Sequence, residues 1–118
     1  MHWLVWIVAG LLAAMFLVAG WSKVSGSEMQ RKGFAERGQS LGFMYLIGAL
    51  ELAGALGLVV GFWVPILALL AAIGLTIIMV GAVFTHVSAK DPLSRAMPAL
   101  VLLVLTLVEV VGRLTIGV

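Results

Sequence analysis

The chain has 118 residues, of which 64% are hydrophobic and 10% charged, and its mean hydropathy is +1.25. This composition is too apolar for a soluble domain, and the absence of cysteine excludes disulfides, thiolate metal sites and iron–sulfur clusters. The net charge of +2 comes from basic residues in polar loops, so it does not indicate nucleic-acid binding.

Four apolar stretches are each long enough to span the hydrocarbon core of a bilayer, at residues 3–24, 41–61, 64–87 and 97–116. They take up about three quarters of the chain, which leaves no room for a soluble catalytic domain. The sequence therefore predicts an all-α fold, an integral membrane four-helix bundle in which residues 1–118 form one transmembrane domain embedded in lipid.

The first stretch resembles a signal peptide but has no basic segment before it and is longer than the apolar part of a signal peptide. Trp3 and Trp6 at one end and Trp21 at the other fit the aromatic belts of a spanning helix. We expect a retained helix.

Residues 25–40 form the longest polar connection. Ser27 followed by Gln30 matches a capping box, which predicts a short helix lying on the membrane surface. Such a helix is either a lid or docking surface, or a solvated connector whose basic residues meet anionic headgroups.

The second stretch carries one carboxylate, Glu51, near its middle. A charged residue there costs ~2.5 to 3.5 kcal/mol on insertion, whereas the surrounding apolar side chains together contribute about −3 to −6 kcal/mol. Small residues at Gly48, Gly54 and Ala55 share the face of Glu51 and permit a close neighbouring helix. We expect Glu51 to point into the bundle. A second small-residue ridge lies on the other side of this helix, which predicts packing on both sides: Ala49, Ala53, Gly57 and Gly61.

Other polar residues are expected at the depth that the Glu51 side chain can reach. Lys23, His86 and Tyr45 lie near the same ends of their helices, with Ser22 and Thr85 beside them. One interpretation is a proton-handling or ligand-binding pocket. The other is that Lys23 snorkels to headgroups, His86 is interfacial and Glu51 is a protonated interhelical hydrogen-bond partner.

Glu109 and Arg113 are four residues apart in the last stretch, so they share a helix face and are expected to form a structural ion pair near the outer end. The rest of that stretch is mostly Leu and Val and is expected to face lipid or a second copy. His2 and His86 are predicted at opposite ends, so one chain cannot ligate haem with both. No catalytic residue and no metal site are assigned.

Six of the seven basic residues fall on one predicted side, which places the first and third loops in the cytoplasm and both termini outside a bacterial-type cytoplasmic membrane. A weak internal similarity suggests a repeat of two helices plus two, with Glu51 and Glu109 at comparable depth.

Three segments resemble the DoxX-like group of small four-helix membrane proteins: LIGALELAGALGL (Leu46 to Leu58), GLTIIMVGAVFTH (Gly74 to His86) and AMPALVLLVL (Ala96 to Leu105). Ala19-Gly20 through Lys23 also fits the end of that group's first helix. The group takes its name from a subunit of a thiosulfate:quinone oxidoreductase, so the resemblance implies redox or quinone chemistry. The resemblance implies a functional role for Glu51, and less directly for Lys23 and His86. Without cysteine, this chain has no thiol for sulfur chemistry.

Three functions remain open at this stage. The first is a subunit or accessory of a membrane oxidoreductase, whose polar pocket accepts a quinone headgroup or relays protons and whose redox cofactor is held by a partner protein. The second is a noncatalytic assembly protein, in which the polar residues specify helix packing. The third is a small transporter, which would need several copies of the chain to build a pore.

Overall fold

The computed structural model describes residues 2–116 and confirms the predicted all-α fold. Its helices are α1 (His2–Val24), α2 (Glu28–Glu36), α3 (Leu41–Val60), α4 (Pro65–Ser88) and α5 (Leu93–Thr115). Four of them, α1, α3, α4 and α5, are long and apolar enough to cross a membrane. The short α2 begins after Ser27, whose hydroxyl accepts a hydrogen bond from the Gln30 backbone N–H. The Gln30 side chain donates to the Ser22 hydroxyl instead of bonding back to Ser27, so only half of the predicted capping box forms.

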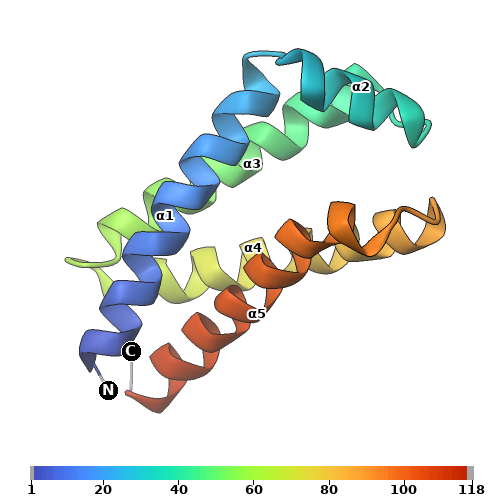
Figure 1. Ribbon diagram of the computed structural model, residues 1–118. Helices are drawn as coiled ribbons and strands as arrows, with labels where there is room; N and C mark the ends of the chain where they lie inside the picture. The colour runs from blue at the N-terminus through green and yellow to red at the C-terminus, as the bar shows by residue number, and fades with distance from the viewer. Residues whose placement is uncertain (1, 117–118) are drawn as a thin grey trace.

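The long helices are arranged as two pairs, α1 with α3 and α4 with α5, which are joined by contacts of α3 with α4 and of α1 with α5. Figure 1 shows the two pairs meeting near the chain termini and diverging toward α2. We call the end with α2 and the α4–α5 turn the loop end, and the end with the termini and the α3–α4 turn the terminal end. The pairs agree with a two-plus-two arrangement, but Glu51 lies ten residues into α3 and Glu109 sixteen into α5. Counted to the terminal end, Glu51 lies nine residues before the last residue of α3 and Glu109 six before the last residue of α5, so Glu109 is somewhat nearer the terminal end of its helix.

One apolar core is shared by all four long helices, and most of its residues lie nearer the terminal end than the loop end. On the loop side it stops at Phe16 of α1 and Met79 of α4. Between these residues and the loop end, each helix pair packs mainly within itself. The core consists of Val8, Leu12, Ala13, Phe16, Ala55, Leu58, Ala68, Ala72, Leu75, Met79 and Leu102.

Helix α3 packs on both sides, as predicted, although Ala49 and Ala53 of the second small-residue ridge are exposed rather than packed. Its first half meets α1 where Gly48 lies against Gly20, and its second half meets α4 where Gly57 lies against Ala71. Because a Cβ at either glycine would lie less than 3 Å from atoms of the neighbouring helix, these contacts need glycine.

Helix α5 differs from the expectation that it faces lipid or a second copy along its length. It begins at Leu93 after Pro92, so Pro98 lies inside it rather than at its start. One face is buried against α1 and α4 and carries Thr106, Glu109 and Arg113 among its apolar residues. Only the opposite face, which includes Val104 and Val111, is exposed.

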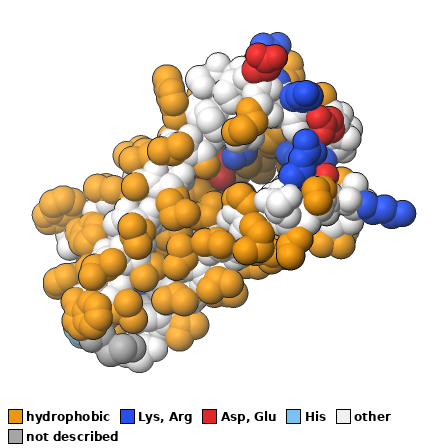
Figure 2. Space-filling view, in the orientation of Figure 1, with side chains coloured by type: hydrophobic (Ala, Val, Ile, Leu, Met, Phe, Trp, Pro, Cys, Tyr) orange, Lys and Arg blue, Asp and Glu red, His pale blue; other side chains and the backbone are white. Residues whose placement is uncertain are grey.

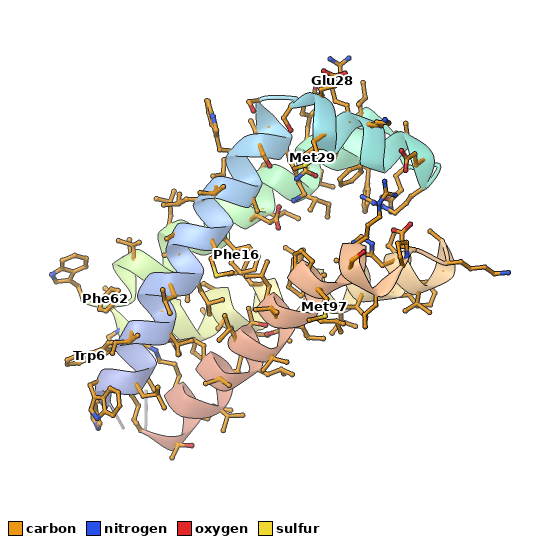
Figure 3. All side chains as sticks on the ribbon, viewed as in Figure 1. Trp6, Phe16, Glu28, Met29, Phe62 and Met97 are labelled. Atoms are coloured by element: carbon orange, nitrogen blue, oxygen red, sulfur yellow. The ribbon has the colours of Figure 1, made fainter. Side chains whose placement is uncertain are left out.

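The two ends of the molecule differ in chemistry. Figure 3 shows Trp6 and Phe62 toward the terminal end, and Glu28 and Met29 on α2 at the loop end. In Figure 2 the basic and acidic side chains gather at the loop end, over an otherwise hydrophobic surface. This distribution fits a protein whose loop end meets water and headgroups.

Candidate functional site

The first element of the candidate site is the close approach of α1 and α3. A Cβ added at Gly48 would lie 2.7 Å from the Lys23 Cβ and 2.9 Å from the Gly20 carbonyl oxygen. A Cβ at Gly20 would lie 2.8 Å from the Gly48 carbonyl oxygen. The paired glycines therefore bring the two backbones close enough for Lys23 to reach α3.

Lys23 and Glu51 form an ion pair at this contact, with Nζ 2.9 Å from Oε1. The Glu51 side chain is 2% exposed and the Lys23 side chain 13%. Glu51 lies on the buried stripe of α3 that continues into the core through Ala55 and Leu58. The pair thus lies directly on the loop side of the apolar core, and its charges offset each other where lone charges would be costly.

Three other residues considered with Glu51 from the sequence lie away from it. Tyr45 is 41% exposed, and its hydroxyl lies beside Gly26 in the α1–α2 turn. Ser22 donates to the Ala19 carbonyl and accepts a hydrogen bond from Gln30, which ties α1 to α2. Thr85 donates to the Gly81 carbonyl on its own helix.

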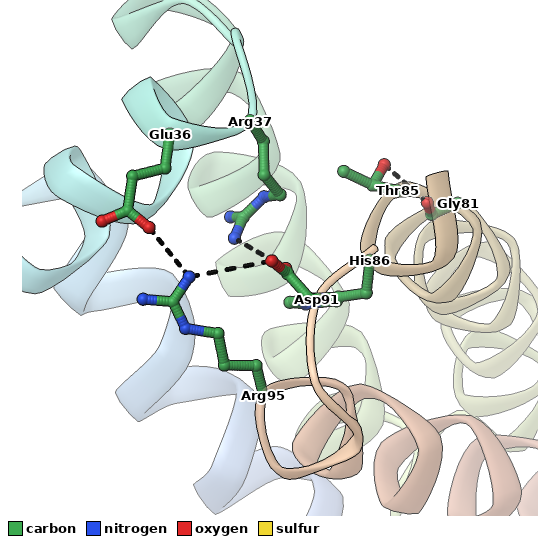
Figure 4. Close-up of polar contacts among 7 residues, drawn as sticks. All are labelled: Glu36, Arg37, Gly81, Thr85, His86, Asp91 and Arg95. Atoms are coloured by element: carbon green, nitrogen blue, oxygen red, sulfur yellow. Dashed lines mark hydrogen bonds and ion pairs between the residues drawn. The ribbon is translucent and has the colours of Figure 1, made fainter. Parts of the chain in front are cut away.

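His86 joins a separate group of charged side chains at the loop end, shown in Figure 4. Its Nδ1 lies 2.7 Å from Asp91 Oδ2. Arg95 Nη1 lies 2.8 Å from Glu36 Oε2 and 3.7 Å from Asp91 Oδ1, and Arg37 Nη1 lies 3.9 Å from Asp91 Oδ2. We call these five residues the loop-end cluster. It connects the end of α2 to α4 and α5.

The exposed Glu36–Arg95 contact is favoured over a wide pH range. The hydrogen bond and charge of Arg95 lower the pKa of Glu36 below its usual value. A carboxylate whose pKa is lower in the folded state stabilises that state above its unfolded pKa, and this stabilisation is lost as the pH falls through the lowered pKa. The contact therefore persists at neutral pH.

A second intramembrane pair lies between the helix pairs, toward the terminal end. Arg113 Nε lies 2.8 Å from Glu109 Oε2, and their side chains are 2% and 0% exposed. Glu109 Oε1 and Arg113 Nη2 have no hydrogen-bond partner among the described residues. Thr106, one turn away, is also fully buried. The sequence predicted the pairing, and the structure shows that it is part of the α5 face that packs against the bundle.

Neither pair opens into the two apolar grooves on the protein surface. One groove of about 550 Å³ runs between α3 and α4 and is lined by residues such as Leu50 and Leu70. The other, of about 380 Å³, runs between α1 and α5 past Leu4 and Val108. Among residues 2–116, no three His, Cys, Asp or Glu side chains are grouped so that they could hold a metal ion.

Comparison with known proteins identifies the family. The DoxX-like family matches residues 7–108. The chain belongs to the DoxX-like family. The uncharacterized protein YdgD of Bacillus subtilis (strain 168) is 30% identical to this chain over 105 residues, which is 88% of this chain and 92% of YdgD. No solved structure matches.

The match covers Lys23, Glu51 and the loop-end cluster, and it ends one residue before Glu109. In this DoxX-like protein, His86 is the one member of the loop-end cluster that the sequence indicated as a candidate site residue. The other four members were missed. Arg37 and Arg95 are interpreted from the sequence only as basic loop residues that set the orientation, and Glu36 and Asp91 are given no role. The available signal was the alternation of positive and negative charge in the two loops predicted on the same side of the membrane, at Glu36, Arg37, Asp91 and Arg95.

Proposed function

We propose that this DoxX-like protein is a subunit or accessory of a membrane redox system, and that Lys23 and Glu51 form the site for a quinone headgroup. The observation that carries the proposal is the Lys23–Glu51 contact of 2.9 Å within the spanning part of the bundle. Intramembrane ionisable residues are costly to maintain, so a pair at this depth favours a functional role.

The two side chains suit the chemistry of a quinone ring. A lysine ammonium group donates hydrogen bonds and stabilises negative charge that develops on a carbonyl oxygen, whereas a carboxylate accepts the hydrogen bond of a quinol hydroxyl. Reduction of a quinone to a quinol takes up two electrons and two protons. We assign the electrons to a partner redox protein, and the holding and transfer of protons to Lys23 and Glu51.

The proposal also covers the orientation of the protein in the membrane and its association with other chains. With the basic loop end in the cytoplasm, both termini lie outside a bacterial-type cytoplasmic membrane. The partner would then approach from the cytoplasm or within the bilayer. Association of copies of the chain, through the apolar surfaces of its helices, is a further part of the proposal that the test below does not require.

A structural function is the second candidate, because the same contact joins α1 to α3. In that case Lys23 and Glu51 would fix the helix pairing of an assembly protein, as buried polar pairs do in some bundles. A transporter is less well supported, since the apolar core from Phe16 to Leu58 lies between the Lys23–Glu51 pair and the terminal end.

The test is mass spectrometry of quinones extracted from the protein purified in mild detergent. We expect the wild-type protein to retain a quinone and Glu51→Gln to lose most of it, because the amide cannot hold or exchange the proton of a quinol. The matched control is Glu28→Gln, an exposed Glu on α2, which should retain the quinone. Retention by Glu51→Gln at the wild-type level, with both variants folded, would contradict the quinone site and leave the structural function.

A further inference from the structure

The two helix pairs are joined differently at their two ends. Toward the terminal end they share the apolar core, which stops at Phe16 and Met79. Toward the loop end, the described part of the chain has no extended backbone contact of α2 with α4 or α5, or of α3 with α5. The Lys23–Glu51 pair lies at the boundary between these two regions.

Across the loop end, side-chain ion pairs connect the two helix pairs. Glu36 on α2 meets Arg95 on α5 at 2.8 Å, and Arg37 at the end of α2 faces Asp91 at 3.9 Å. His86 holds Asp91 at 2.7 Å, and so fixes this carboxylate to the end of α4. Figure 4 shows these side chains reaching toward one another from the two sides. We call Glu36, Arg37, Asp91 and Arg95 the latch.

The latch is weaker than the apolar core that holds the other end. The Glu36 and Arg95 side chains are 40% and 48% exposed, and exposed ion pairs contribute little stability and are screened by salt. The Arg37 and Asp91 side chains are only 13% and 10% exposed, but their charged atoms are 3.9 Å apart, which is too long for a hydrogen bond. The core residues are almost completely buried and closely packed. When the molecule opens, the loop end therefore separates before the core does.

An opening is also needed if a ligand is to reach Glu51. The Glu51 side chain is 2% exposed, so no headgroup can contact it in the arrangement described. Figure 2 shows the surface hollowed between the two helix pairs at the loop end, with charged side chains around the hollow. Separation of α2 and α3 from α5 would extend this hollow to the Lys23–Glu51 pair and would leave its side open to lipid.

We infer that the latch controls a lateral entrance from the bilayer to the Lys23–Glu51 pair. The ligand class that fits such an entrance is a membrane-dissolved amphiphile, whose polar head reaches Lys23 and Glu51 while its apolar tail remains between the helix pairs or in lipid. The identity of the ligand as a quinone rests on the proposed function, but the opening of the latch does not.

The test measures the distance across the latch in a chain that has no native cysteine. Ala35 on α2 and Ser94 on α5 are small and exposed. Ala35→Cys and Ser94→Cys can therefore carry spin labels for distance measurement by pulsed electron–electron double resonance in lipid nanodiscs. At low salt we expect one short distance. Arg95→Gln, which removes the contacts of Arg95 with Glu36 and Asp91 at an exposed residue, should produce a second, longer distance, as should about 1 M salt.

Arg31→Gln is the matched control, since Arg31 is an exposed arginine on α2 that takes part in none of the latch contacts, and it should leave the distance unchanged. A distance that is the same in wild type and Arg95→Gln at every salt concentration would overturn the latch. Glu36 and Arg95 meet through the ends of two long side chains, so Glu36→Cys and Arg95→Cys would be joined by a short bis-methanethiosulfonate crosslinker rather than by a direct disulfide. The crosslink should lock the short distance and slow quinone uptake, and its reduction should restore uptake. Uptake at an equal rate with the crosslink formed would overturn the entrance.

These readouts separate the two proposals. If the distance responds to Arg95→Gln but wild type retains no quinone, the latch stands and the quinone site fails. If wild type retains quinone but the distance never changes, the quinone site stands and the latch fails.

Discussion

Replacing Arg113 with methionine is expected to lower the free energy of unfolding by about 3–5 kcal/mol, because the substitution leaves Glu109 as an uncompensated buried charge. Both side chains of this pair are at most 2% exposed, so neither water nor headgroups can replace the guanidinium. The measurement is unfolding in mixed micelles with increasing sodium dodecyl sulfate, followed by circular dichroism.

The double variant Glu109→Gln/Arg113→Met is the control for this prediction. It removes both charges, so most of the lost stability should return. If the double variant is as unstable as Arg113→Met alone, the loss comes from packing rather than from the unpaired carboxylate.

Replacing Gly48 with alanine is expected to lower the free energy of unfolding by about 1–3 kcal/mol, the usual cost of overpacking. The new Cβ would lie 2.7 Å from the Lys23 Cβ and 2.9 Å from the Gly20 carbonyl oxygen, so α1 and α3 must move apart. This movement also draws Lys23 away from Glu51, and quinone retention should fall together with stability. The same micelle unfolding measures the effect.

Gly81 on α4 provides the comparison, because a Cβ at this position meets nothing within 4 Å. Gly81→Ala should leave stability unchanged or raise it by about 0.5–1 kcal/mol, which is the helix-propensity gain over glycine. Equal stability of Gly48→Ala and Gly81→Ala would show that the close approach of α1 and α3 is not required.

Local sequence patterns were sufficient to predict the helices. Apolar length predicted the spanning segments, Ser27 and Gln30 predicted a short surface helix, and the small residues around Glu51 predicted that α3 packs on two sides. These features depend on residues a few positions apart. The sequence could therefore reveal them without knowledge of how the helix pairs meet.

The loop-end cluster depends instead on contacts between distant parts of the chain. Glu36 and Arg95 are 59 residues apart, and neither carries a mark that distinguishes it from an ordinary loop charge. His86 was grouped with Glu51 by depth alone, but Asp91, five residues later, lies within its reach after the turn that ends α4. Depth along a helix does not specify direction around it, which is why Tyr45 also lies away from Glu51.

The buried face of α5 shows the same limit. Its Leu- and Val-rich composition matches a lipid-facing helix, because lipid and a membrane-protein core are both apolar. Thr106, Glu109 and Arg113 recur at spacings of three and four residues and mark the face that is buried. Their spacing contained more information about packing than the average hydropathy did.

Photocrosslinking can show directly whether a quinone headgroup binds at Lys23 and Glu51. A quinone with a photoreactive group on its ring would be added to the protein in lipid nanodiscs, illuminated, and the modified peptides mapped by mass spectrometry. We expect adducts concentrated near Lys23 on α1 and Glu51 on α3, which excess unmodified quinone abolishes. Adducts spread along lipid-facing residues such as Val104 and Leu70, and insensitive to excess quinone, would contradict binding at this pair.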